Sequence, residues 1–281
     1  TLACIIPIII LPYYCAIGGW VLKYLTAFLT KSGAAAAAAD GYFTGFITSS
    51  VEPIVLMLIF MSVTALVIYL GVDKGIEKFS RILMPILIVL VVGIAIFSVT
   101  ISYTDAEGIT RTGWEGLKIY LIPNFEGLTV KRFFTVLMDA MGQQFYSLSV
   151  AMGIMIAYGS YVKDDINLNE SVTSIQIFDT IVGILSGLMI VPAVYIFSGE
   201  EGLATGGAGL MFKTLPKVFD AMPMGSIVGA AFFVLVFLAA LTSSISLMEA
   251  IVSMFMDKFK LTRIKAVFII YAITLILGVP S

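Results

Sequence analysis

Histidine is absent from all 281 residues, which excludes histidine-based acid–base catalysis and most transition-metal sites. Charge is scarce, since Asp, Glu, Lys and Arg make up only 12% of the chain, about half their share in soluble domains. The two cysteines, Cys4 and Cys15, fit neither a zinc pattern nor an extracellular disulfide framework. With a net charge of −2 and no basic stripe, the sequence gives no reason to expect a nucleic-acid partner.

Enzyme signatures are missing as well. The sequence contains no Gly-x-Ser-x-Gly, no His-Glu-x-x-His and no phosphate-binding loop pattern. A serine–lysine hydrolase would need a lysine at membrane depth, and Lys23, the one candidate, lies near the end of its apolar segment. We therefore expect a protein that is not an enzyme.

Apolar residues dominate what is present. They make up 60% of the chain, and the mean hydropathy is +1.07. About seven segments approach the ~20 residues that cross a bilayer as a helix, the last being short. They are 2–29, 51–70, 82–103, 133–161, 171–197, 225–255 and 266–279. This pattern predicts an all-α, multi-pass protein of the cell (inner) membrane, with the lipid bilayer as its surroundings.

The connections between these segments differ in length. The short connections near 71–81, 162–170 and 256–265 carry lysine and arginine, which predicts that they lie on the cytoplasmic side. The long connections 104–132 and 199–224 would then be extracellular, the second folded as two short helices that either cap a vestibule or form a surface loop. The run of six alanines at 34–39 permits a helix, but we interpret it as a low-complexity loop.

The stretch 142–153 (GQQFYSLSVAMG) organises the chain. Its polar and small residues lie in the middle of an apolar segment, where they are costly unless they face protein, water or a ligand. A helix broken between Tyr146 and the region 150–152 explains them, because unwound carbonyls and the Ser147 and Ser149 hydroxyls could then bind small ions. The alternative is an intact helix whose serines bond to their own turn.

Asp179 is a second candidate, since an aspartate among apolar residues in lipid indicates a functional site. We expect a cation there, although Asp179 could instead pair with a lysine near a helix end. A third candidate is the helical face that carries Ala239, Thr242, Ser243 and Ser246, whose oxygens suit an alkali cation but which could equally be helix-packing residues.

Two further groups at bilayer depth need partners. Glu249 is either linked to protons or a structural hydrogen-bonding residue, and the sequence does not decide between them. In the motif 12–14 (PYY), a tyrosine hydroxyl could donate to a substrate carboxylate or to a backbone carbonyl.

Three motifs together resemble the neurotransmitter:sodium symporter family, in its bacterial amino-acid branch: 142–149 (GQQFYSLS), 241–246 (LTSSIS) and 12–14 (PYY). The resemblance runs over essentially the whole chain. It implies a leucine-transporter-type fold of two inverted five-helix repeats, of which residues 1–281 look like one partial transmembrane domain. Residues 1–103 resemble helices three to five, and 133–281 resemble helices six to nine. The remaining helices, including the broken helix one, would be further parts of the same protein, and a homodimer is a possible assembly.

The resemblance also implies residue roles. Sodium ions would bind at a first site with Ser147 and Asp179, and at a second with Ala239, Thr242 and Ser243. The substrate pocket would be lined by Ile10, Tyr14, Tyr146, Ser147, Ser149, Met152, Ser243 and Leu247, with Tyr14 on the substrate carboxylate. Gln143 and Tyr14 would belong to the outer gate.

The sequence departs from the family pattern at three positions. Many members carry asparagine where Asp179 stands, and chloride-dependent members carry a serine at the position of Gly183. We therefore predict chloride independence, with the Asp179 carboxylate supplying the negative charge. Met152 replaces a phenylalanine that is common in relatives, and its adaptable side chain favours bulky hydrophobic or aromatic substrates.

The predicted function is sodium-coupled import of a neutral amino acid by alternating access. Two alternatives stay open. One is a proton-coupled amino-acid permease of the same fold that uses Asp179 or Glu249, and the other is a non-transporting channel or sensor protein.

Overall fold

The computed structural model describes residues 5–104, 108–163, 166–203 and 206–279. Cys4 lies outside the described residues, whereas Cys15 is buried with a free thiol. In chain order the elements are α1 (Ile5–Phe28), α2 (Lys31–Ala38), α3 (Tyr42–Ile47), α4 (Glu52–Tyr69), η2 (Val72–Glu77), α5 (Lys78–Thr100), β1 (Ser102–Thr104), β2 (Thr110–Thr112), α6 (Gly113–Leu121), α7 (Val130–Ser147), α8 (Ile154–Gly159), α9 (Leu168–Leu203), α10 (Gly207–Gly209), η3 (Leu210–Thr214), α11 (Leu215–Ala221), α12 (Gly225–Phe259) and α13 (Arg263–Gly278).

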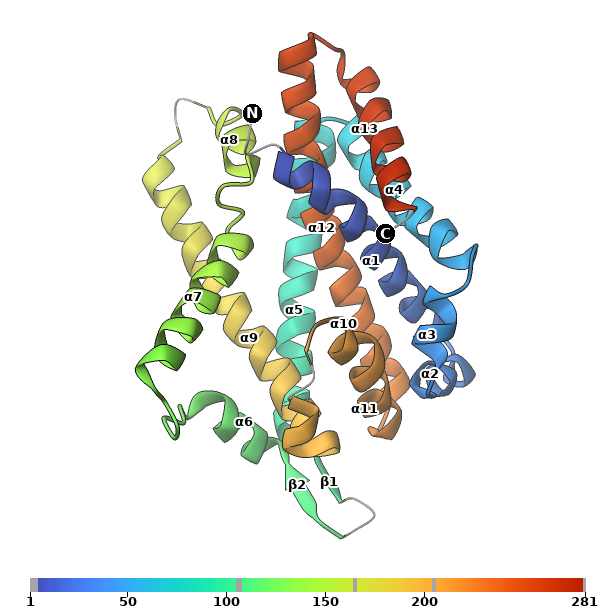
Figure 1. The fold of residues 1–281 in the computed structure, drawn as a ribbon, viewed down its shortest axis with the longest axis vertical. Coiled ribbons are helices and arrows are strands. Elements are labelled where there is room, and N and C mark those ends of the chain that lie inside the picture. Colours follow the sequence, from blue (N-terminus) through green and yellow to red (C-terminus); the bar gives the residue numbers. More distant parts are fainter. Residues whose placement is uncertain (1–4, 105–107, 164–165, 204–205, 280–281) are drawn as a thin grey trace.

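The predicted helical membrane architecture is confirmed (Figure 1). Among the described residues, five helices are long and apolar enough to cross a membrane: α1, α4, α5, α9 and α12. The last predicted segment forms α13, whose 16 residues are fewer than the ~20 of a full span. The segment predicted at 133–161 is broken into α7 and α8. A short antiparallel hairpin of β1 and β2, which we did not predict, follows α5.

Helix α1 packs along both α4 and α12 (Figure 1). Two glycines bring α1 close to α4. A Cβ added to Gly19 would lie 2.7 Å from the backbone nitrogen of Met57, and one on Gly18 would lie 2.5 Å from the Phe60 ring. The two helices therefore meet almost backbone to backbone, as small residues permit in membrane proteins.

An aromatic cluster fixes the segment after α9 to the core. The Tyr24 hydroxyl donates to the Phe212 carbonyl at 2.6 Å, and the Phe28 ring packs edge-on against Phe219. Both partners lie in the segment 199–224, which forms short helices as predicted. These contacts join η3 and α11 to the second half of α1.

The alanine run was wrongly predicted as a loop, because it lies in α2 up to Ala38. Thr30 caps this helix by accepting from the Gly33 amide at 3.1 Å, and alanine has the highest intrinsic helix propensity. Lys217 of α11 adds an ion pair of 2.5 Å to Asp40, just beyond α2. The hydrogen bond from this ammonium holds the pKa of the exposed Asp40 carboxyl below its usual value.

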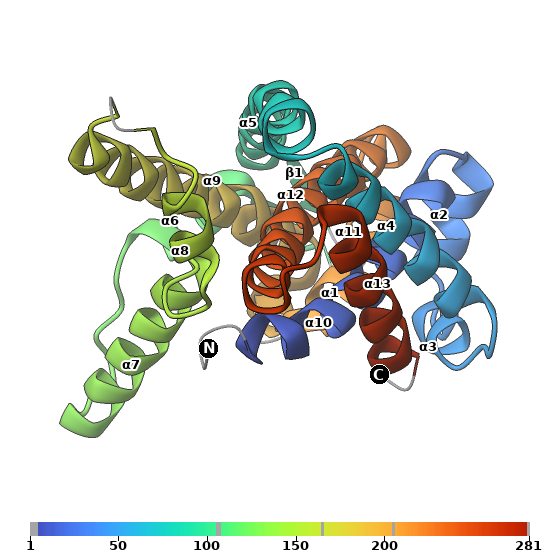
Figure 2. The ribbon, with the colours of Figure 1, turned by 90° about the horizontal axis from the view of Figure 1, so that it is seen from above.

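Helix α7 projects away from the main helical body and diverges from α9, which it meets near its C-terminal end (Figure 2). None of its residues is buried, and large apolar side chains such as Phe134 and Met138 are more than half exposed. The position of α7 relative to the other described helices therefore depends on contacts at its C-terminal end.

Candidate functional site

The break in the polar stretch is confirmed. Helix α7 ends at Ser147 and α8 begins at Ile154, one and two residues later than the predicted boundaries. Between them the chain turns through left-handed conformations at Ser149 (φ 56°), Ala151 (φ 65°) and Gly153 (φ 75°). A left-handed conformation costs a residue with a side chain about 1–2 kcal/mol. Such strain persists only where the surrounding structure requires it.

The unwound link frees backbone groups that a helix would pair. The last bond back into α7 runs from the Val150 amide to the Phe145 carbonyl at 2.9 Å, and α8 starts with Ala157 bonding to Gly153 at 3.0 Å. Among the described residues, the carbonyl oxygens of 148–152 accept no backbone hydrogen bond. Unwound carbonyls at the bilayer midplane can serve as cation ligands.

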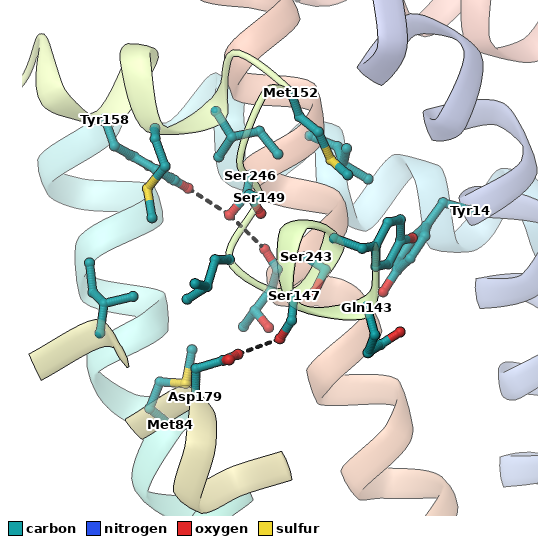
Figure 3. Close-up of a pocket in the computed structure, with 17 residues that line it drawn as sticks. Tyr14, Met84, Gln143, Ser147, Ser149, Met152, Tyr158, Asp179, Ser243 and Ser246 are labelled. Atoms are coloured by element: carbon teal, nitrogen blue, oxygen red, sulfur yellow. Dashed lines mark hydrogen bonds between the residues drawn. The ribbon is translucent and has the colours of Figure 1, made fainter. Parts of the chain in front are cut away.

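A cavity of about 550 Å³ opens beside this link (Figure 3). Its walls come from α1, α5, α7, the α7–α8 link, α8, α9 and α12. The lining residues are Tyr14, Met84, Gln143, Tyr146, Ser147, Leu148, Ser149, Met152, Ile154, Met155, Tyr158, Ile175, Asp179, Thr242, Ser243, Ser246 and Leu247. Mixed apolar walls with a few converging polar groups are typical of small-molecule sites.

Asp179 of α9 reaches the end of α7 at the edge of this cavity. The Ser147 hydroxyl donates to its Oδ1 atom, and the Gln144 side-chain amide donates to Oδ2 at 3.0 Å (Figure 3 shows the Ser147 bond). No lysine or arginine pairs with Asp179 within the described residues, so the alternative of a lysine partner is not realised there. A half-buried carboxylate without a paired cation favours a positive ligand.

The opposite wall is part of α12, where the hydroxyls of the stretch 239–246 divide into two groups. Thr242 and Ser243 face the cavity, and the Thr242 hydroxyl also donates to the Ala239 carbonyl at 3.0 Å. Ser244 instead is fully buried and shares a hydrogen bond of 2.8 Å with Thr64 of α4. The stretch therefore has both expected features: Thr242 and Ser243 face the cavity, and Ser244 packs against α4.

Most of the predicted site residues meet at this cavity. Ten of them line it: Tyr14, Gln143, Tyr146, Ser147, Ser149, Met152, Asp179, Thr242, Ser243 and Leu247. Ile10 does not, and packs against the apolar cluster of α1, α4 and α12. Ala239 is also off the wall, and its carbonyl already accepts from Thr242. The ligand roles of all these residues stay predictions.

Sequence reasoning missed two polar residues of the site. Gln144 binds Asp179, and the Tyr158 hydroxyl of α8 shares a hydrogen bond of 2.8 Å with Ser246. The rule that a tyrosine hydroxyl at bilayer depth needs a partner applied to Tyr158 as well as to Tyr14. For Gln144 the signal was its place in a doubled glutamine ahead of the break.

The structure favours a structural role for Glu249. Its carboxylate is 1% exposed and accepts two hydrogen bonds from Arg263, at 2.7 and 2.8 Å. The Tyr161 hydroxyl adds a third at 2.7 Å, and Arg263 also donates to the Ile68 carbonyl at 3.1 Å. Glu249 therefore joins α12, α13, α4 and the segment after α8, away from the cavity wall.

Comparison with known proteins decides the family. The model of the sodium:neurotransmitter symporter family matches residues 45–281. This chain belongs to that family. It is 33% identical to an uncharacterized sodium-dependent transporter, YhdH, of Bacillus subtilis over 87% of this chain and 51% of the relative. It is 30% identical to another such transporter of Haemophilus influenzae, over 96% of this chain and 57% of the relative.

A solved structure shares the fold. The crystal structure of MhsT in complex with L-phenylalanine superposes with a TM-score of 0.83 at 36% identity, covering 99% of this chain and 60% of that one. The chain thus spans a little over half the length of these relatives. The match confirms the predicted family, whose members are multi-pass membrane transporters rather than enzymes.

Proposed function

We propose that this chain carries about half of the binding site of a sodium-coupled symporter that imports a neutral amino acid. The observation that carries the proposal is the Ser147–Asp179 hydrogen bond at the helix break, facing Thr242 and Ser243 across one cavity. Hydroxyl, carboxylate and free carbonyl oxygens are the hard ligands that alkali cations prefer, and the site brings all three together.

Two sodium positions follow from this arrangement. A first ion would bind between Ser147 and Asp179, where the carboxylate balances its charge. A second would bind near Thr242 and Ser243, with the Ala239 carbonyl reached only if Thr242 gives up its present bond. The substrate would lie between them, its carboxylate near Tyr14 and its side chain toward Met152 and Leu247.

A bulky hydrophobic or aromatic amino acid suits this cavity best. The volume of about 550 Å³ falls within the range of roughly 300–1,000 Å³ typical of small-molecule pockets. Met152 is 9% exposed and can adapt its shape to a large side chain. The related structure of MhsT contains L-phenylalanine.

Transport of sodium and substrate would be coupled because both bind in the same cavity. Ions at both positions neutralise the polar midplane and draw α7 with its link toward α9 and α12. Closure on the outer side would involve Gln143 and Tyr14, and release would follow loss of the second ion on the cytoplasmic side of the cell (inner) membrane. No chloride is required, because Asp179 already supplies a fixed negative charge.

Uptake into proteoliposomes tests this function. Radiolabelled phenylalanine should accumulate when a sodium gradient is imposed and should not accumulate with choline in place of sodium. Accumulation driven by a pH gradient without sodium would favour the proton-coupled alternative. Ion currents that do not saturate with substrate would favour a channel.

A further inference from the structure

One hydrogen bond at the site comes from a residue outside the cavity wall. Gln144 lies one helical turn before Ser147 on α7, so the two side chains project from the same helix face. Its Nε2 atom donates to Oδ2 of Asp179 at 3.0 Å, while Ser147 donates to Oδ1. Each oxygen of the carboxylate therefore receives one donor from α7.

These two donors would respond differently to a cation. For Ser147 and Oδ1 of Asp179 both to face a cation, the hydroxyl proton must turn away from Oδ1, which exchanges a hydrogen bond for ion contacts. Gln144 donates to the other oxygen through an amide nitrogen, which has no lone pair to offer a metal. Its bond can therefore persist with the ion bound or absent.

Gln144 also contributes to the placement of the whole helix. Among the described residues, the bonds of Gln144 and Ser147 to Asp179 are the side-chain hydrogen bonds that link α7 to α9. No residue of α7 is buried, so apolar packing does little to fix the register of the two helices. When a cation replaces the Ser147 bond, the Gln144 bond remains to hold the carboxylate.

We propose that Gln144 is a positioning residue for the first sodium site, holding the Asp179 carboxylate so that Oδ1 faces Ser147 and the cavity. The inference rests on the proposed function, because it assumes that sodium binds at Asp179. Partners that orient a metal ligand typically contribute about 10- to 100-fold to metal affinity. Since Gln144 is exposed in this structure, we expect the lower end of that range.

Two substitutions of similar length test the proposal. Gln144→Met removes the donor and should raise the half-saturating sodium concentration for uptake about tenfold. The maximal rate at saturating sodium should stay near wild type. Gln144→Glu places a second carboxylate against Asp179 and should raise that concentration further. Gln176→Met is the matched control, since Gln176 lies one turn before Asp179 on α9 and has no side-chain bond to it, and it should behave as wild type.

Heat stability gives a readout that does not depend on transport. Sodium should raise the melting temperature of the detergent-solubilised protein, and Gln144→Met should shift the midpoint of this effect about tenfold upward in sodium. Equal melting temperatures without sodium would show that the variant is folded. The inference is overturned if Gln144→Met stays within about twofold of wild type, or if it lowers only the maximal rate. Wild-type uptake without sodium dependence would instead overturn the proposed function.

Discussion

The hydroxyl of Ser147, the last residue of α7, donates a hydrogen bond to the carboxylate of Asp179 in the first half of α9. This bond joins the broken helix to its neighbour at the point where the backbone leaves the helical conformation. It places a negative charge and a hydroxyl on one side of a cavity that Thr242 and Ser243 close from the other side.

Removing the Ser147 hydroxyl should weaken sodium binding without unfolding the protein. In Ser147→Ala, the expected sodium ion loses a neutral ligand, and Asp179 keeps the Gln144 hydrogen bond among the described residues. The half-saturating sodium concentration for uptake should therefore rise about tenfold. Ser160→Ala is the control, because that hydroxyl donates only to the Ala157 carbonyl of its own turn. Equal sodium dependence of the two variants would argue against a ligand role for Ser147.

Uptake should not require chloride. The Asp179 carboxylate supplies a fixed negative charge beside the expected sodium, so replacing chloride with gluconate should change the initial rate by less than about twofold. In Asp179→Asn this charge is lost, and sodium-driven uptake should fall at least about tenfold. A large loss of wild-type uptake in gluconate would refute the assignment of this charge.

The substrate should be bulky and apolar. In a competition assay, unlabelled phenylalanine or leucine should inhibit uptake at concentrations at least about tenfold below glycine, since several buried methylene groups are worth ~0.8 kcal/mol each. Met152→Trp narrows the cavity and should reduce inhibition by phenylalanine more than inhibition by alanine. A preference for glycine or alanine in the wild type would count against the proposed pocket.

Replacing one partner of the buried Arg263–Glu249 ion pair should destabilise the protein more than replacing both partners. Among the described residues, Arg263→Met leaves Tyr161 as the one side chain that binds the buried Glu249 carboxylate, and breaking a buried pair in this way typically costs about 3–5 kcal/mol. The double variant Arg263→Met with Glu249→Gln removes both charges and should recover most of the lost melting temperature. If the single and double variants have the same melting temperature, the charge of Arg263 does not hold Glu249 in place.

Left-handed geometry in the unwound link should make Gly153 hard to replace. Gly153 has φ of 75° and is the N-cap residue just before α8, so Gly153→Ala should cost about 1–2 kcal/mol. Gly159→Ala, at the end of α8 and with no atom within 4 Å of an added Cβ, is the control and should be nearly neutral. Melting curves of the two variants would make this comparison.

Sequence reasoning located the break because polar and small residues in the middle of an apolar segment rarely suit a continuous helix that faces lipid. It failed for the alanine run, where low complexity was weighed above alanine's helix propensity and the cap at Thr30. Gln144 and Tyr158 were missed because their importance depends on partners 35 and 88 residues away. Ile10 was placed in the pocket by resemblance; it is not among the lining residues, but it packs against the buried cluster that includes Met152 and Leu247, which do line the cavity.

Equilibrium binding of radiolabelled sodium to the purified protein tests the central claim most directly. The account predicts saturable binding in the wild type, loss of one class of sites in Asp179→Ala, and loss of the other in Thr242→Val. Equal sodium binding by all three proteins would contradict it, because the cation would then lie away from the break and from α12.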